Sequence, residues 1–390
     1  MPGFEVFGEE ERMAINDLFD ANGGILFAHG FDAMRADIYR VREFEQAFAA
    51  RMGVPHAQAV SSGSTALKVG LKALGVKPGD EVITTAFTFV ATVESVLEVG
   101  ARPVIVNINK TLNIDPGAIE AAITPQTAAI IVVHMMGAPA EMEAIIQIAD
   151  RHQIPVLEDN AQCCGGTYHG KTLGTLGAVG TFSFDGGKTM TTGEGGMVVT
   201  SREDFYLRAR AYHDHGHEYS TTVGRGAEGA LITGFNYRMM ELQGAIGLVQ
   251  LGKLDDINRR QRENKQRLKG LLRDLPVEFR PLADEEGEIG DAVIFYLASR
   301  EVTEAFARRM ADYQMGTKNL PDALRWHFAR HWQHMYSEYD FYADSFETQW
   351  QASADILERA IALPVMVNMT PDTIETWAEN LHKIADELIG

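Results

Sequence analysis

Cysteine is almost absent from this chain of 390 residues: there are two, Cys163 and Cys164, and they are neighbours. Adjacent cysteines rarely reach disulfide geometry, and two thiols cannot complete a tetrahedral zinc site on their own. The sequence therefore argues against a disulfide framework and against a cysteine-rich zinc module. It is typical of a reducing compartment.

Long apolar runs are missing as well. No window approaches the roughly 18 uninterrupted apolar residues of a membrane-spanning helix. The N-terminal stretch MPGFEVFGEEERMAINDLFD is acidic and lacks the apolar core of a signal peptide. We therefore expect a soluble, cytoplasmic protein.

Positive charge is scarce, with 35 Lys and Arg residues against 54 Asp and Glu, which gives a formal net charge of −19. A surface this acidic repels phosphate backbones and anionic lipids, so we expect no nucleic-acid partner and no membrane partner. The apolar content of 45% is that of an ordinary globular protein with a large core.

Short runs rich in Val and Ile alternate with helical patterns along the first half of the chain. Seven runs predict strands, at residues 56–60, 81–85, 102–106, 128–133, 154–159, 179–184 and 196–200. Such strands, separated by helices, indicate an α/β fold with a mainly parallel sheet covered on both faces. A charged helical pattern from Lys253 to Arg273, which we interpret as a solvated face, leads onward. We predict a large domain over residues 1–255 and a smaller α+β domain over 256–390.

Three loops that follow predicted strands carry polar groups. Residues 61–66, SSGSTA, run directly into a helix, and the free N–H groups there suit a phosphate, although an ordinary helix cap explains them equally. Asp159 ends a strand, where it either caps a helix or holds a cation in a poorly solvated site. Lys188 lies in a glycine-lined turn, five residues after Ser183. Each signal is weak by itself, but ligands bind where these loops meet.

The three loops together match what pyridoxal 5'-phosphate (PLP) requires: a lysine, an acid for the pyridine nitrogen, a phosphate cup and an aromatic face. Several stretches, among them VHMMGAPAEM, PVLEDNAQCCGGTYHGKTLGTLGAVGTFSF, TGEGGMVV and GFNYRMMELQGAIGLVQL, closely resemble the DegT–DnrJ family of sugar aminotransferases. The resemblance runs from about residue 10 to 260 and is weaker beyond. It implies a fold type I enzyme with PLP as its cofactor, and a homodimer with shared active sites.

The resemblance implies a role for individual residues. Lys188 would hold the cofactor and move the proton at the substrate carbon, and Asp159 would keep the pyridine nitrogen protonated. The remaining cofactor contacts would come from Ser64, Thr65, Phe89, Gln162, Ser183 and, from a second subunit, Asn236. Between Ser183 and Lys188 this chain has Phe-Asp-Gly-Gly, where the family more often carries His or Tyr and a Pro or Thr. That departure affects the expected shape of the pocket mouth.

Two histidine groups need a separate interpretation. His327, His331 and His334 have the spacing of one helix face, which we interpret as a packing or substrate-facing helix rather than a zinc site. His213, His215 and His217 alternate in a predicted loop, and the family resemblance places His215 near the active site. We expect no metal.

Three functions stay open. The first is transfer of an amino group from glutamate or glutamine to an oxo-sugar. The second is a sugar dehydratase of the same family, which usually has His at this position, so Lys188 argues against it. The third is a non-catalytic regulatory relative, which would have lost Lys188 or Asp159; both are present. The substrate would be a nucleotide-linked 3- or 4-keto hexose or, because GTKNLPDALRWHFARHW resembles enzymes that make 8-amino-Kdo for lipopolysaccharide, 8-oxo-Kdo. For that sugar acid the candidate carboxylate partners are Lys318, Arg325 and Arg330.

Overall fold

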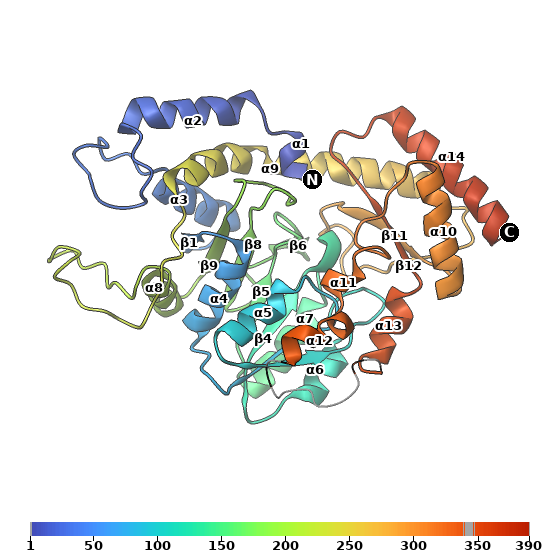
Figure 1. Ribbon diagram of the computed structural model, residues 1–390, viewed down its shortest axis with the longest axis horizontal. Coiled ribbons are helices and arrows are strands. Elements are labelled where there is room, and N and C mark those ends of the chain that lie inside the picture. The colour runs from blue at the N-terminus through green and yellow to red at the C-terminus, as the bar shows by residue number, and fades with distance from the viewer. Residues whose placement is uncertain (1, 338, 340–345, 347, 390) are drawn as a thin grey trace.

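The computed structural model describes residues 2–337, 339, 346 and 348–389 (Figure 1). Its centre is a seven-stranded sheet with the strand order β1-β9-β8-β5-β4-β2-β3. All strands are parallel except β9, which runs antiparallel to both of its neighbours. The strands are β1 (His56–Val60), β2 (Glu81–Thr85), β3 (Arg102–Val106), β4 (Thr127–Val133), β5 (Val156–Asp159), β8 (Val179–Ser183) and β9 (Gly196–Thr200). Each coincides with a predicted run to within two residues.

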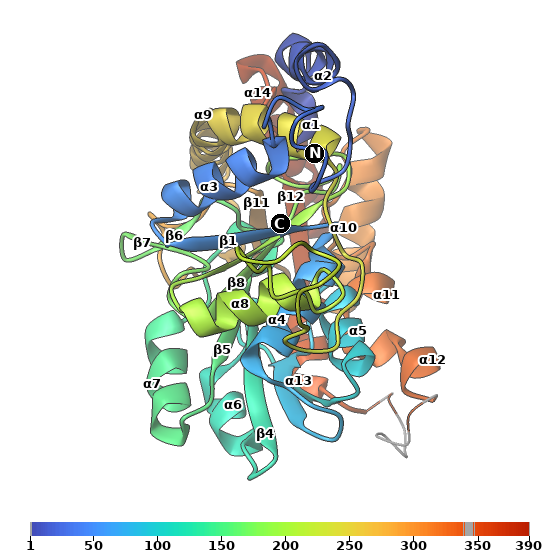
Figure 2. The same ribbon diagram turned by 90° about the vertical axis from the view of Figure 1, so that its left-hand side faces the viewer.

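Helices cover both faces of this sheet, which confirms the predicted α/β fold (Figure 2). On one face lie α4 (Gly63–Leu74), α5 (Ala91–Glu98) and α8 (Glu203–Tyr212). On the other face lie α3 (Arg40–Met52), α6 (Pro116–Ala122), α7 (Met142–His152) and α9 (Glu241–Leu271). Strand β4 shows why: Ile131 and Val133 pack on the first side, and Ile130 and Val132 on the second. Alternate side chains of a strand point to opposite faces, so a strand that is apolar throughout needs cover on both.

The long helix α9 is not simply the solvated face that its charges predict. Asn258, Gln261 and Lys265 are buried in its C-terminal half. The Asn258 amide donates to the Cys164 carbonyl at 3.1 Å, and the Gln261 amide donates to the Val365 carbonyl at 2.8 Å. The helix therefore binds the central sheet to the C-terminal region. It also runs through residue 255 without a break, so the domain boundary there stays a prediction.

The C-terminal region is built on a second, antiparallel sheet of β10 (Glu278–Phe279), β11 (Ala292–Tyr296) and β12 (Ala360–Pro364). Helices α10 (Arg300–Asp312) and α14 (Pro371–Leu388) pack on it in a core of their own. At the other end of the chain, α1 (Pro2–Glu5) and α2 (Glu9–Asn22) lie along α9 (Figure 1). The short elements are β6 (Thr167–Tyr168), β7 (Lys171–Thr172), η1 (Met135–Gly137), α11 (Leu324–His327), η2 (Ala329–His331), α12 (Gln333–Tyr336) and α13 (Gln351–Leu357).

The predicted helix that would align His327, His331 and His334 is wrong. The chain forms three separate turns there, because Phe328 is extended, with φ −122° and ψ 123°. Phe328 forms a bridge with Phe87, and the next N–H, that of Ala329, donates to the Ala86 carbonyl at 2.9 Å. Pairing with the segment after β2 thus overrides the local helical pattern.

Across the described parts of the chain, no helix combines the length and the apolar character needed to cross a membrane.

Candidate active site

Three loops meet at the carboxyl ends of β1, β5 and β8, as the sequence predicts for a ligand site in a parallel sheet. Together with the start of α5 they line one cavity. Six of the eight predicted cofactor residues border it: Ser64, Phe89, Asp159, Gln162, Ser183 and Lys188.

Asp159 is the last residue of β5 and is buried, with 3% of its surface exposed. The Ala161 N–H donates to its Oδ1 at 3.1 Å, and the Thr92 hydroxyl donates to its Oδ2 at 3.0 Å. Burial raises the pKa of Asp159 above its ordinary value, while these two hydrogen bonds and the charge of Lys188 act in the opposite direction. A carboxyl held this way favours a cationic partner, which would restore its charged form.

Lys188 lies in the loop between β8 and β9, and its Nζ is 3.6 Å from Asp185 Oδ2. Asp185 itself lines the cavity and accepts a hydrogen bond from the Gly187 N–H at 2.6 Å. The Lys188 carbonyl accepts from the Gly3 N–H at 3.1 Å, so the N-terminal segment fixes the loop from outside. The lysine amine therefore borders the cavity on a backbone that is held from two sides.

The predicted phosphate cup is formed by the start of α4 and the end of β8. Ser62, Gly63 and Ser64 border the cavity, and the first N–H groups of a helix have no partner within it. A Cβ on Gly63 would lie 2.5 Å from the Ser183 Cβ, so glycine is needed for this close approach. Thr65 does not line the cavity: its hydroxyl accepts from the Ser62 N–H at 2.9 Å and donates to the Ser62 carbonyl at 2.8 Å. It closes the capping box of the helix instead.

The aromatic side chain of Phe89 lines the cavity, and that of His327 lies beside it. The Phe89 side chain is 42% exposed, and its ring centroid lies 5.5 Å from that of His327. The Nδ1 of His327 is 2.9 Å from the Ala323 carbonyl, which can only accept, so Nδ1 carries the proton. Burial lowers the pKa of His327, which favours the neutral ring near Lys188. The exposed ring face of Phe89 suits stacking on a flat ligand.

Besides Thr65, five further predicted residues lie away from the described lining of this cavity. Asn236 borders a separate apolar hollow beside residues 24–34. His215 is exposed, in a left-handed conformation with φ 53°. Lys318 pairs with Asp291, and Arg330 donates from Nε to the Gln349 carbonyl at 3.0 Å. Arg325 is exposed.

Arg325 is in α11, next to Trp326, and this segment contacts the site through its backbone. The Val90 N–H donates to the Trp326 carbonyl at 3.0 Å, and the Thr88 N–H donates to the His327 carbonyl at 2.9 Å. The C-terminal region is thus attached to the loop that carries Phe89, without placing any of the three predicted cations in the described cavity wall.

In the described part of the chain, no group of three or more His, Cys, Asp or Glu side chains could hold a metal ion. Of the alternating histidines, His213 is buried and His217 Nδ1 lies 2.7 Å from Glu228.

Sequence reasoning missed two groups that border the site. Thr92 binds Asp159 from the first turn of α5, and its hydroxyl also lies 2.7 Å from that of Thr88. The only signal in the sequence is that these two threonines are four residues apart, hence on one side of a helical turn. Ser62 borders the cavity, whereas Thr65, the residue predicted to contact the phosphate, does not. The two differ because Ser62 is the N-cap and Thr65 its capping-box partner.

The residues present fit PLP on structural grounds. The start of α4, which Gly63 allows to lie close to Ser183, suits the phosphate. The buried carboxyl of Asp159 suits the protonated ring nitrogen, and Lys188 supplies the amine. When bound, PLP supplies a ring that accepts electrons from the substrate carbon. Together with the α/β fold, these groups define a PLP-dependent aminotransferase of fold type I.

Comparison with known proteins identifies the family. The chain belongs to the DegT/DnrJ/EryC1/StrS aminotransferase family, whose model matches residues 35–382. The GDP-perosamine synthase of Caulobacter vibrioides is 45% identical over 215 residues, which are 55% of this chain and 57% of that protein. The spore coat polysaccharide biosynthesis protein SpsC of Bacillus subtilis is 33% identical over 358 residues, 88% of this chain and 89% of that protein. The chain is therefore a PLP-dependent sugar aminotransferase.

The fold comparison agrees. The X-ray structure of the aminotransferase from Psychrobacter cryohalolentis matches with a TM-score of 0.87 at 26% identity, and the match covers 98% of each chain. This match confirms the predicted fold type I architecture, and membership of the family confirms the predicted PLP cofactor.

Proposed function

We propose that this protein transfers the amino group of glutamate to the carbonyl carbon of an oxo-sugar carried on a nucleotide. The proposal rests on one combined observation: the chain has a cavity lined by Lys188 and Asp159, and it is 45% identical over 215 residues to a GDP-perosamine synthase, whose name indicates a GDP-linked product. A keto sugar presents a carbonyl that an amino group can replace, and the site offers the amine and the buried acid for that exchange.

Within this proposal each residue of the chain has one task. Asp159 keeps a proton on the ring nitrogen of the cofactor, since its carboxylate needs a cation in buried surroundings. The Nζ of Lys188 takes a proton from the carbon of the donor in the first half-reaction, and in the second half-reaction it delivers a proton to the carbon of the sugar. Ser62, Gly63 and Ser64 hold the phosphate, and Phe89 covers the ring.

A free sugar acid, 8-oxo-Kdo, is the second candidate, and its support is the sequence resemblance of residues 316–332. It needs a cation for its carboxylate. Lys318 is paired with Asp291, and Arg330 with the Gln349 carbonyl, which leaves the exposed Arg325 as the best placed of the three. The similarity to GDP-perosamine synthase supports the nucleotide-linked keto sugar as the first candidate.

A half-reaction screen tests the substrate. The enzyme is loaded with PLP and ¹⁵N-glutamate, freed of excess donor, and offered a GDP- or UDP-linked 3- or 4-keto hexose or 8-oxo-Kdo in parallel. We expect ¹⁵N to appear in a nucleotide-linked amino sugar. Transfer to 8-oxo-Kdo alone, lost in Arg325→Ala and kept in the matched variant Arg308→Ala of α10, would establish the sugar acid instead. Release of 2-oxoglutarate in the first step checks the donor separately.

We propose further that two chains share their active sites. Asn236 lies outside the cavity of its own chain, and beside it is an apolar hollow of about 610 Å³ whose walls include the exposed Phe27, Phe31 and Met34. Exposed apolar patches of this kind are typical of protein interfaces. Sedimentation of the wild type should give a dimer. Mixing inactive Lys188→Ala chains with Asn236→Ala chains should restore one intact site per heterodimer, and no restoration would contradict shared sites.

A further inference from the structure

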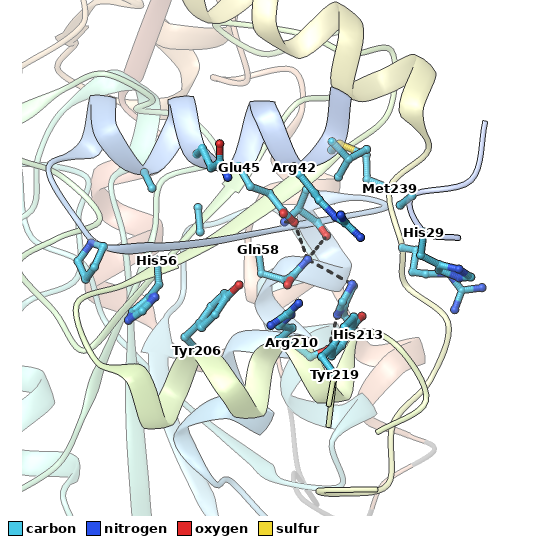
Figure 3. A pocket seen from close by; sticks show the side chains of 18 residues that line it. His29, Arg42, Glu45, His56, Gln58, Tyr206, Arg210, His213, Tyr219 and Met239 are labelled. Atoms are coloured by element: carbon cyan, nitrogen blue, oxygen red, sulfur yellow. Dashed lines mark hydrogen bonds between the residues drawn. The ribbon is translucent and has the colours of Figure 1, made fainter. Parts of the chain in front are cut away.

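A second cavity, of about 250 Å³, lies at the free edge of the central sheet (Figure 3). Strand β1 forms this edge, with α3 above it and α8 below it in Figure 2. Among the described residues, none that lines this cavity also lines the cavity of Lys188. It is therefore separate from the Lys188 cavity, and it adjoins the apolar hollow beside Asn236, with which it shares Ala28, Arg238 and Met239.

Three arginines line this edge cavity: Arg42, Arg210 and Arg238. The Arg42 guanidinium carbon lies 3.7 Å from the ring centroid of Tyr39, and that of Arg210 lies 3.9 Å from the ring centroid of Tyr219. Stacking on a ring fixes a guanidinium while its N–H edge stays available. Figure 3 shows Arg42 coming from α3 and Arg210 from α8, on the two sides of Gln58.

The charges of these arginines are not balanced from within. In the described part of the chain, neither Arg42 nor Arg210 forms an ion pair, whereas Arg238 pairs with Asp214. Glu45 is the only acidic side chain in the described cavity wall. Its Oε1 already accepts from the Ala59 N–H at 2.8 Å and from the Gln58 amide at 2.6 Å.

The neighbouring titratable groups do not change this balance. Burial raises the pKa of Glu45 to about 7, so part of its population is neutral near pH 7. His213 also faces Gln58, at 3.2 Å, and burial lowers its pKa to about 4, so its ring is neutral. The cavity is therefore positive, in a protein whose net charge is −19.

We propose that this cavity binds a small anion, carrying a phosphate or a carboxylate group, between the guanidinium groups of Arg42 and Arg210. The planar fork of arginine matches both groups, because two parallel N–H donors meet two oxygens. A volume of about 250 Å³ falls below the roughly 300 Å³ at which pockets for drug-sized ligands begin, so the ligand has few heavy atoms. The tyrosine rings order both guanidinium groups before binding and so reduce the entropy cost.

Calorimetric titration of the full-length enzyme tests the proposal. PLP is kept bound so that the phosphate cup at Ser62 is filled, and chloride holds the ionic strength constant. Inorganic phosphate and succinate are the two probes, and they distinguish a phosphate ligand from a carboxylate one. We expect one of them to bind once per chain, and Arg42→Gln or Arg210→Gln to weaken that binding roughly tenfold or more.

Matched controls lie on the same two elements. Arg51 of α3 pairs with Asp255, and Arg202, which directly precedes α8, pairs with Asp204; both are outside the cavity wall. Arg51→Gln and Arg202→Gln should bind the probe as the wild type does. Because the cavity variants also remove the stacking contacts with Tyr39 and Tyr219, Gln46→Glu serves as a milder change. It adds a negative charge at an exposed wall position and should also weaken binding.

Three results would overturn the proposal. The first is that neither probe gives saturable binding. The second is that the control variants weaken binding as much as the cavity variants do. The third is that folded Arg42→Gln, Arg210→Gln and Gln46→Glu proteins all bind like the wild type.

Discussion

Two cavities of this protein, one at Lys188 and one at Arg42, each place a carboxyl group with a raised pKa near positive charge, yet they are suited to different tasks. Asp159 and Glu45 both have a pKa raised by burial, and each accepts a backbone N–H. The cation near Asp159 is a lysine, which can lose its proton and act as a nucleophile. The cations near Glu45 are arginines, which stay charged at any pH a protein meets. The first cavity can do chemistry, and the second can only bind.

The two cavities also lie at different places on the sheet. The Lys188 cavity lies where the strands end, so loops from distant parts of the chain meet there. The arginine cavity lies along the outer edge of β1, where side chains of α3 and α8, together with loop residues such as Tyr219 and Arg238, close the sheet. Loops can hold a lysine close to a ligand, whereas side chains stacked across an edge form a fixed charged wall.

The largest effect is expected from removing the lysine. Lys188→Ala leaves no group that can move the proton, so turnover should fall on the order of 10⁴-fold. Cofactor binding should persist, since the cup at Ser62 and the carboxyl of Asp159 are untouched. Lys188→Arg is the matched variant: it keeps the positive charge beside Asp185 and should be equally inactive. Measurable steady-state turnover near the wild-type rate in either variant would remove Lys188 from its proposed role.

Asp159→Asn should cost roughly 10²-fold or more in turnover, because a neutral amide cannot keep the cofactor nitrogen protonated. The amide oxygen can still accept from the Ala161 N–H, so the local backbone is kept. The comparison variant is Thr92→Val, which removes one hydrogen bond to the carboxylate and no charge. We expect it to lose much less activity in the same assay. Equal losses in the two would mean that contacts, and not charge, matter at this position.

Glu45→Gln addresses the arginine cavity. The folded pKa of about 7 lies above the ordinary glutamate value near 4.3, so between these values the folded state holds more protons than the unfolded state. The contribution of Glu45 to the stability of the wild type should therefore fall as pH rises from about 4 to 7. At pH 8 the variant should be more stable by about 2 kcal/mol, and the difference should vanish near pH 4. Urea unfolding across this range measures it, and a difference that does not change with pH would contradict the burial of Glu45.

The smallest effect is expected at the phosphate cup. Gly63→Ala would place a Cβ 2.5 Å from the Ser183 Cβ, so the helix start and the strand end must separate. We expect a loss of about 1 kcal/mol in stability and weaker PLP binding. Gly186→Ala is the control in the same site, because nothing lies within 4 Å of that position. If both variants bind PLP alike in a fluorescence titration, the cup is wider than the close approach of Gly63 indicates.

Much of this architecture could be predicted from local sequence. The Val- and Ile-rich runs gave the strands of the central sheet within two residues, because a strand buried on both faces must be apolar throughout. The glycine-lined turn at Lys188 and the polar end of β5 at Asp159 were visible in the same way. Six of eight predicted cofactor residues border one cavity, since the ends of parallel strands share an edge.

The failures lie where distant segments compete with local pattern. Residues 327–334 have helical spacing, but Phe328 pairs with Phe87 and breaks the helix. Charged residues of α9 suggested a solvated face, but Asn258 and Gln261 turn inward to bind carbonyl groups of other elements. In both cases the decisive partner is far away in the chain, and its distance cannot be estimated from spacing.

The sequence by itself determined the α/β fold, the family and the lysine–aspartate pair, because periodicity and short motifs depend on neighbours along the chain. Only the tertiary structure decided that Thr65 serves the helix cap, that Gly3 supports the lysine loop, and that Arg42 and Arg210 face one cavity. Arg42 and Arg210 are 168 positions apart and belong to helices above and below one strand. The two guanidinium groups line one cavity only because both helices pack at the same edge of the sheet, that of β1.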